Sequence, residues 1–265
     1  MTKNLFAKSV LVQEAVKLLK ENPNGMTSLS LARRLFEMEN VTEALAENLL
    51  RALFKEDSRF RKINDRWFLN LWNMVLNVPI AETTFVALDV EIIGRGKSSK
   101  IVELAAFKIR DDTVQDEFYS LVNPGRPLSP GWFEPSRFAG EALEQAPNAS
   151  AVLKEFANFV DNAVLLAHNA RFDIRVLNLE WSRFSHFGLA APVIDTLPLF
   201  RKWLPGLDAY NLQQVAVYFG VDLSQHHRAR SDAFALSQIF IRLLRRLENQ
   251  GVRTLVQLKD AFLPK

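Results

Sequence analysis

The chain has 265 residues, of which 48% are hydrophobic, as expected for a globular protein with one large or two smaller domains. It contains no cysteine, which excludes disulfides and thiolate metal sites, so a bound metal would need carboxylate, imidazole or backbone oxygen ligands. No apolar run reaches the roughly 18 residues that span a bilayer, and no secretory signal is recognised at the start. We therefore expect a cytoplasmic protein with no membrane partner.

The formal net charge is +3, and it is distributed unevenly along the chain. Residues 1–72 hold 12 Lys and Arg against 9 Asp and Glu, whereas the two kinds are balanced in the remainder. The whole positive excess therefore lies in the N-terminal quarter. This gives weak support for a basic appendage on a neutral body.

The first 72 residues predict a small, mainly helical domain. Residues 8–21, 28–38 and 42–56 space their apolar positions as amphipathic helices do. The segment RFRKINDRWFL, residues 59–69, reads as two short strands around an Asn64-Asp65 turn. Three helices followed by a hairpin predict a winged-helix-like domain over 1–72.

This domain is a candidate nucleic-acid contact. Arg61, Lys62 and Arg66 lie among aromatic residues of the hairpin, and such a mixture contacts phosphates and stacks on bases. Glu43 and Glu47 of the third helix argue against groove binding, because acids there repel phosphates. The alternative is a domain that binds protein or only packs.

Residues 73–84 lose clear periodicity and contain Pro79, which predicts a linker before a second domain over 85–265. Three consecutive strand-like runs joined by short polar links open this domain, followed by alternating helices and strands. The order predicts an α/β fold with a mixed sheet flanked by helices. The expected strands are 85–92, 101–110, 115–122, 163–169 and 192–196, and the expected helices include 149–161 and 170–184.

Four carboxylates lie at the ends of these predicted elements. Asp89 and Glu91 end the first strand, and because side chains alternate along a strand, both should point to the same face. Asp173 and Asp232 fall in the first turns of helices, the second with Ser231 as an expected N-cap. Each acid alone is explained by the helix dipole or by a solvated strand end. Together they repel one another unless a cation such as Mg²⁺ or Mn²⁺ binds.

Three ordered segments carry a family resemblance that covers about residues 84–248. The segments ALDVEIIG, LLAHNARFD and HHRARSDA resemble the three motifs of the DEDDh 3′–5′ exonucleases. This family includes the epsilon subunit of bacterial DNA polymerase III and RNase T. The resemblance implies a ribonuclease-H-like fold, in agreement with the predicted order of strands.

The resemblance also implies the roles of individual residues. Two divalent ions would be held by Asp89, Glu91, Asp173 and Asp232, in a two-metal site for phosphodiester hydrolysis. His227 would be the general base, on the loop ahead of the last helix, and His226 is its rival. His168 and Asn169 are expected to shape the turn of the second motif and to contact substrate.

The first motif departs from the family pattern at two positions. Family members commonly carry two threonines after the glutamate, where the terminal nucleotide binds, whereas this chain has Ile92 and Ile93. Aliphatic side chains can pack against a sugar or base, but they remove two hydroxyl groups. The substitution puts the substrate preference in question and leaves the catalytic set complete.

The sequence thus predicts a metal-dependent 3′–5′ exonuclease that releases nucleoside monophosphates from single-stranded or unpaired 3′ ends. DNA is favoured over RNA by analogy with the epsilon subunit, and a polymerase-associated subunit that works mainly through protein contacts is a further alternative. The N-terminal domain would contact duplex DNA or protein. The alternatives are an RNase T-like RNA 3′ trimmer and a nucleic-acid-binding regulatory module with a weak or idle nuclease domain.

Overall fold

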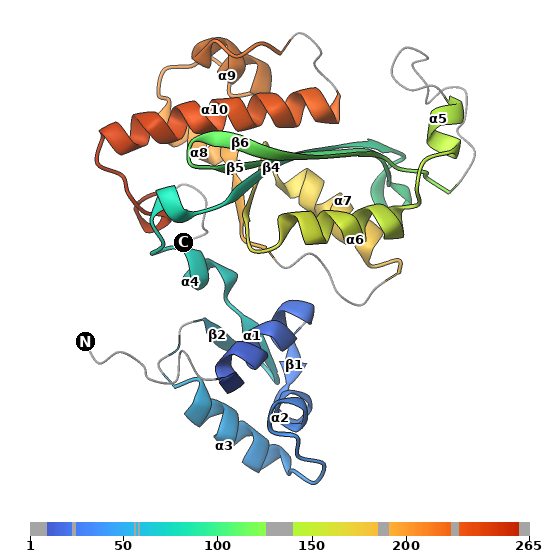
Figure 1. Ribbon diagram of the computed structural model, residues 1–265, viewed down its shortest axis with the longest axis vertical. Coiled ribbons are helices and arrows are strands. Elements are labelled where there is room, and N and C mark those ends of the chain that lie inside the picture. Colours follow the sequence, from blue (N-terminus) through green and yellow to red (C-terminus); the bar gives the residue numbers. More distant parts are fainter. Residues whose placement is uncertain are drawn as a thin grey trace. The chain divides into compact units, whose positions relative to one another are not determined.

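The computed structural model describes residues 10–22, 25–55, 57, 59–125, 140–184, 191–223 and 228–259. Two compact units meet in the chain between Met74 and Val75, within the segment that the sequence predicts as a linker (Figure 1). None of the helices in these described ranges is long and apolar enough to cross a membrane. Each unit is described separately below.

The N-terminal unit combines three helices with a small antiparallel sheet. The helices are α1 (Val10–Glu21), α2 (Ser28–Phe36) and α3 (Glu43–Leu53); the strands are β1 (Met26–Thr27), β2 (Phe60–Ile63) and β3 (Arg66–Leu69), in the order β1-β3-β2. The predicted helices and hairpin are confirmed, with Asn64 in the left-handed conformation that the turn requires (φ 54°). The two-residue β1 was not predicted, since it is too short to show a period. The winged-helix assignment stays a prediction.

The second unit is built on a five-stranded mixed sheet in the order β6-β5-β4-β7-β8. β4 pairs antiparallel with β5, and parallel with β7, which confirms the predicted mixed sheet. The strands are β4 (Phe85–Ile93), β5 (Lys100–Arg110), β6 (Thr113–Leu121), β7 (Val164–Ala167) and β8 (Val193–Asp195). The helices are α4 (Leu71–Val75), which crosses the division, α5 (Gly140–Glu144), α6 (Ala149–Val160), α7 (Arg171–Trp181), α8 (Thr196–Trp203), α9 (Leu212–Phe219) and α10 (Ala229–Asn249).

Helices cover both faces of this sheet (Figure 1). The long α10 lies across β4 and β5 on one face, while α6 and α7 lie on the other. Because both faces are covered, β4 and β5 are apolar over most of their length and are buried there. Phe85 of β4 meets Phe240 of α10 edge to face, with ring centroids 5.0 Å apart. This packing fixes α10 against the strand that carries the first two candidate acids.

Segment 75–84 packs against the C-terminal part of the same unit. The Ile80 N–H donates to the Arg253 carbonyl at 2.8 Å, and the Val256 N–H donates to the Leu76 carbonyl at 2.8 Å. The short 3₁₀ helix Ile80–Glu82 lies between these contacts and the start of β4. The segment is therefore held along its length before the sheet begins.

The pairing of β4 changes at its C-terminal end. Its parallel pairing with β7 extends as far as Ala87 with Leu166, and its pairing with β5 shifts register between Glu91 and Ile92. Asp89 and Glu91 thus lie beyond the last β7 pair and before the bulge. This end of the sheet is where ligands commonly bind in open α/β folds.

The predicted N-cap of α10 is wrong. The helix begins at Ala229, so Ser231 lies inside its first turn and cannot cap it. The N-cap residue is Arg228, whose own side chain makes no capping bond. Asp232 still lies in the first turn, as predicted.

Candidate active site

Three carboxylates meet at the end of β4. One oxygen each of Asp89, Glu91 and Asp232 lies within 4.8 Å of the other two. The alternation along β4 directs the first two acids to one face of the sheet, as predicted from their spacing. The first turn of α10 then brings the third acid to them, from more than 140 residues away in sequence. A set of three converging carboxylates suits a hard divalent cation.

Asp173 of α7 joins this cluster. It lies in the first turn of α7 and is 5% exposed. Its carboxylate accepts a hydrogen bond from the backbone N–H of Val90, the residue between the first two acids. It lies outside the group of three but close enough to Asp89 to raise that pKa. The structure therefore brings all four predicted acids to one place.

The electrostatics of the cluster favour a bound cation. Burial raises the pKa of Asp89 well above its usual range, and the charges of Asp173, Asp232 and Glu91 raise it further. Burial likewise raises the pKa of Asp173 to about 7, against the lowering effect of its backbone hydrogen bonds. Acids in such surroundings resist ionisation unless positive charge is supplied. The oxygen-only donor set fits Mg²⁺ or Mn²⁺.

The second motif shapes the turn between β7 and α7. Asn169 adopts the left-handed conformation (φ 61°), which Asn tolerates better than most residues, and its N–H donates to Asp195 at 3.1 Å. The His168 Nδ1 lies 3.1 Å from the Thr196 hydroxyl, and its ring stacks on Phe200. Burial lowers the pKa of His168, which favours the neutral ring. These contacts fit the shaping part of their predicted role, and their contact with substrate stays a prediction.

Two further predictions concern substrate and base. Ile92 and Ile93 end β4 directly after the bulge and are partly exposed. They remain available to pack against a substrate, which is their predicted role. His227 and its rival His226 lie outside the described residues, so the general base stays a prediction.

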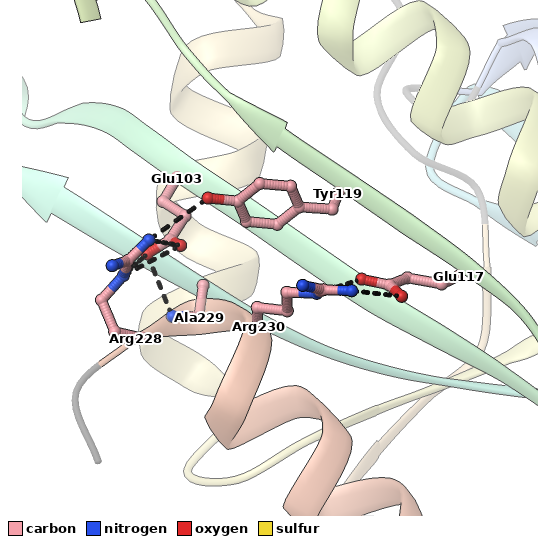
Figure 2. Close-up of polar contacts among 6 residues, drawn as sticks. All are labelled: Glu103, Glu117, Tyr119, Arg228, Ala229 and Arg230. Atoms are coloured by element: carbon pink, nitrogen blue, oxygen red, sulfur yellow. Dashed lines mark hydrogen bonds and ion pairs between the residues drawn. The ribbon is translucent and has the colours of Figure 1, made fainter. Parts of the chain in front are cut away.

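Sequence reasoning missed a buried ion pair next to the acids. Glu103 of β5 is fully buried and lies opposite Glu91 in the β4–β5 ladder. The Arg228 side chain donates to it from Nε at 3.2 Å and from Nη2 at 3.0 Å (Figure 2). An acid in the middle of the apolar run IVELAAF was the available signal, since a lone charge rarely stays inside a sheet.

Two of the three hairpin residues that the sequence predicts to contact nucleic acid are already bonded within the N-terminal unit. Lys62 forms an ion pair with Glu47 of α3, with 2.5 Å between Nζ and Oε2. Arg66 donates to the Gly25 carbonyl at 2.9 Å. Arg61 is exposed on β2. Of these three residues, Arg61 is therefore the best candidate for the predicted contact with nucleic acid.

The family model RNase_T, described as Exonuclease, matches residues 86–240. This range contains the four clustered acids and both residues of the buried ion pair. The chain belongs to the DEDDh 3′–5′ exonuclease family. Its second unit is thus a hydrolytic nuclease domain, and enzymes of this family use two divalent ions, Mg²⁺ or Mn²⁺.

Curated relatives include the DNA polymerase III PolC-type proteins of Oceanobacillus iheyensis and Staphylococcus saprophyticus. The first is 35% identical over 180 residues, which is 68% of this chain and 13% of the relative. The second is 37% identical over 173 residues, which is 64% of this chain and 12% of the relative. The chain therefore spans only about an eighth of the length of these relatives.

Solved structures confirm the ribonuclease-H-like exonuclease fold. Exonuclease X in complex with 5′ overhanging duplex DNA is 24% identical with a TM-score of 0.52, covering 67% of this chain and 98% of that one. The nuclease domain of 3′hExo, a DEDDh family member bound to rAMP, is 16% identical with a TM-score of 0.55, covering 62% and 92%. E. coli Exonuclease I in complex with a dT13 oligonucleotide is 17% identical with a TM-score of 0.54, covering 64% and 43%.

The raised pKa of Asp173 predicts a pH-dependent stability in metal-free buffer. Its folded pKa of about 7 exceeds the usual aspartate pKa of 3.8, so the protonated form is favoured on folding. The associated stabilisation is present at acidic pH and is lost as the pH rises through about 7. Between pH 5 and 8 the free energy of unfolding should fall by about 2–3 kcal/mol more in the wild type than in Asp173→Asn.

Urea unfolding at several pH values in the presence of chelator measures this difference. Asp116→Asn, a change at an exposed carboxylate of β6, is the control and should follow the wild type. Added Mg²⁺ should restore the stability of the wild type at pH 8. Parallel pH dependences of the wild type and Asp173→Asn would contradict the prediction.

Proposed function

We propose that this chain removes nucleotides from single-stranded or unpaired 3′ ends, prefers DNA, and releases nucleoside 5′-monophosphates. The observation that carries the proposal is the convergence of Asp89, Glu91 and Asp232, whose carboxylate oxygens lie within 4.8 Å of one another. Asp173 accepts a hydrogen bond from the N–H of Val90, the residue between Asp89 and Glu91. Such a cluster is suited to hold cations at a scissile phosphate. The DNA preference is supported by the names of the PolC-type relatives and of the Exonuclease X and Exonuclease I complexes.

Hydrolysis adds water across the bond between phosphorus and the 3′ oxygen of the preceding nucleotide. When bound, the divalent ions supply the positive charge that neutralises the carboxylates and stabilises charge developing on the phosphate. Asp89, Glu91, Asp173 and Asp232 would hold these ions. His227 would take a proton from the attacking water, and the departing 3′ oxygen would gain a proton to become the new 3′ hydroxyl.

The end of β4 supplies the contact to the terminal nucleotide in this proposal. Ile92 and Ile93 follow the metal ligands directly and are partly exposed, so they lie where a sugar or base would approach. Their aliphatic surface would pack against the nucleotide and would make no hydrogen bond. Affinity for the 3′ end would then depend on shape more than on hydroxyl contacts.

An RNA 3′ trimmer is the second candidate, because two of the similar structures are described with rAMP and with a histone mRNA stem-loop. A third is a polymerase accessory subunit, suggested by the PolC-type relatives, whose full length the chain covers only in small part. The assays below separate these candidates by sugar preference and by the need for a partner.

Digestion of 5′-labelled single-stranded DNA and RNA of one sequence tests the proposed activity. With Mg²⁺ or Mn²⁺, the wild type should give a ladder that shortens from the 3′ end, faster on DNA. Asp232→Ala should lower the rate by at least about a thousandfold, because it removes one of three converging ligands. Asp116→Ala, at an exposed acid, should retain the wild-type rate.

Chelator should abolish the ladder of the wild type. Faster digestion of RNA would reverse the proposed preference and favour RNA trimming. Absence of cleavage of both strands with either metal would contradict the proposal for the chain acting alone.

The Ile pair predicts a change in substrate affinity. Ile92→Thr with Ile93→Thr should change KM by about three- to tenfold and kcat by less than about twofold, because these residues would bind the nucleotide without taking part in the reaction. Ile92→Val with Ile93→Val keeps the aliphatic surface and serves as the control. A large loss of kcat at unchanged KM would contradict the assigned role.

The N-terminal unit is proposed to add a phosphate contact through Arg61. On an Asp232→Ala background, which prevents cleavage, Arg61→Ala should reduce the salt dependence of duplex DNA binding by about 0.9 in log–log slope. Lys17→Ala, at an exposed residue of α1 paired with Glu14, is the control. An unchanged slope would instead favour a protein-docking role for this unit.

A further inference from the structure

Glu103 is a charged group buried completely in the middle of β5. Its Oε1 accepts hydrogen bonds from Arg228 Nε at 3.2 Å and Nη2 at 3.0 Å, and its Oε2 accepts from the Ala229 N–H at 3.1 Å (Figure 2). The Tyr119 hydroxyl also bonds to it. A buried carboxylate is tolerated only with such compensation. Because both oxygens are engaged in this way, Glu103 is not positioned as a metal ligand.

These bonds hold the first residues of α10. The N–H groups of a first helical turn have no partner within the helix, and the N-cap residue Arg228 offers no capping side chain. Glu103 therefore caps α10 from the sheet. The Arg228 carbonyl in turn accepts a hydrogen bond from the Asp232 N–H at 3.0 Å. Glu103 thus holds Arg228 through its side chain, and Arg228 in turn holds the backbone of Asp232.

The same carboxylate lies beside the other metal-binding acids. Glu103 is the ladder partner of Glu91, and its neighbour on the same face, Ala105, is the partner of Asp89. Ala105 and Ala229 of α10 belong to the same buried apolar cluster. The cap is therefore one strand away from the acids of β4 and one helical turn away from the acid of α10.

We propose that Glu103, acting through Arg228 and Ala229, is a positioning residue that fixes Asp232 against Asp89 and Glu91. The inference rests on the proposed metal-binding role of these acids. Arg228 also directly follows the proposed base His227 in the chain. Mutation of groups that orient metal ligands in this way typically lowers metal affinity or activity by about 10- to 100-fold.

A second ion pair provides a matched comparison. Arg230, also in the first turn of α10, pairs with Glu117 of β6, with 2.5 Å between Nε and Oε1 and 3.0 Å between Nη2 and Oε2 (Figure 2). This pair joins the same helix to the same face of the sheet, but it is exposed and caps no helix N–H. Exposed ion pairs contribute little to the free energy of unfolding.

The test compares Glu103→Gln, Glu117→Gln and the wild type as full chains. Titration with Mn²⁺ alone, followed by calorimetry well below the melting temperature, gives the metal affinity independently of nuclease activity. Glu103→Gln should weaken Mn²⁺ binding by about tenfold or more, lower kcat by a similar factor and change KM by less than about threefold. Glu117→Gln should stay within about twofold of the wild type in all three.

Mn²⁺ affinity within twofold of the wild type in Glu103→Gln would overturn the inference, as would an equal loss in Glu117→Gln. A purely structural role would lower the melting temperature of Glu103→Gln and leave its metal affinity at low temperature unchanged. If the wild type binds Mn²⁺ but cleaves no nucleic acid, the proposed function fails and the affinity comparison still decides the role of Glu103.

Arg228 supplies a second variant in case Glu103→Gln does not fold. Its side chain is 37% exposed, and Arg228→Gln keeps an amide N–H that can still donate to Glu103 while the charged partner is removed. Its loss of Mn²⁺ affinity should match that of Glu103→Gln, and the double variant should lose no more than either single one, because both act through one contact. Unchanged affinity in Arg228→Gln would also overturn the inference.

Discussion

The repulsion among carboxylates at the end of β4 is the constraint on which the functional part of this structure depends. Asp89, Asp173 and Asp232 come from three different elements, and the charges of the last two, which are buried, raise the pKa of Asp89. A folded chain keeps such groups together only if its remaining contacts hold the three elements firmly. The Phe85–Phe240 contact joins β4 to α10, and the Val90 N–H bond joins β4 to α7. The Glu103 cap joins α10 to β5, the antiparallel neighbour of β4.

The acids of the site could be predicted from sequence because local rules place them. Alternation along a strand sends Asp89 and Glu91 to one face, and helix starts locate Asp173 and Asp232 without any knowledge of tertiary contacts. The cap of α10 could not be predicted in this way. The helix starts three residues earlier than Ser231 suggests, because its capping group comes from β5, more than 100 residues away. Only the folded sheet brings that carboxylate to the helix.

The charge of the N-terminal unit shows a related limit of sequence reasoning. The sequence suggests that Glu47 of α3 repels nucleic acid and that Lys62 of the hairpin attracts it. In the structure Lys62 and Arg51 both pair with Glu47, so these charges largely satisfy one another. The charge available to bind a partner depends on which charged side chains stay exposed and unpaired, and the amino-acid composition does not give this.

The register shift between Glu91 and Ile92 has a consequence for how this strand can change during evolution. A bulge absorbs a local change of pairing, so length or sequence changes beyond it need not alter the alignment of the residues before it. The register of Asp89 and Glu91 therefore does not depend on the residues at 92 and 93. Bulky residues at 92 and 93 can replace the family's threonines while the acids keep their places, which lets specificity diverge without loss of the reaction chemistry.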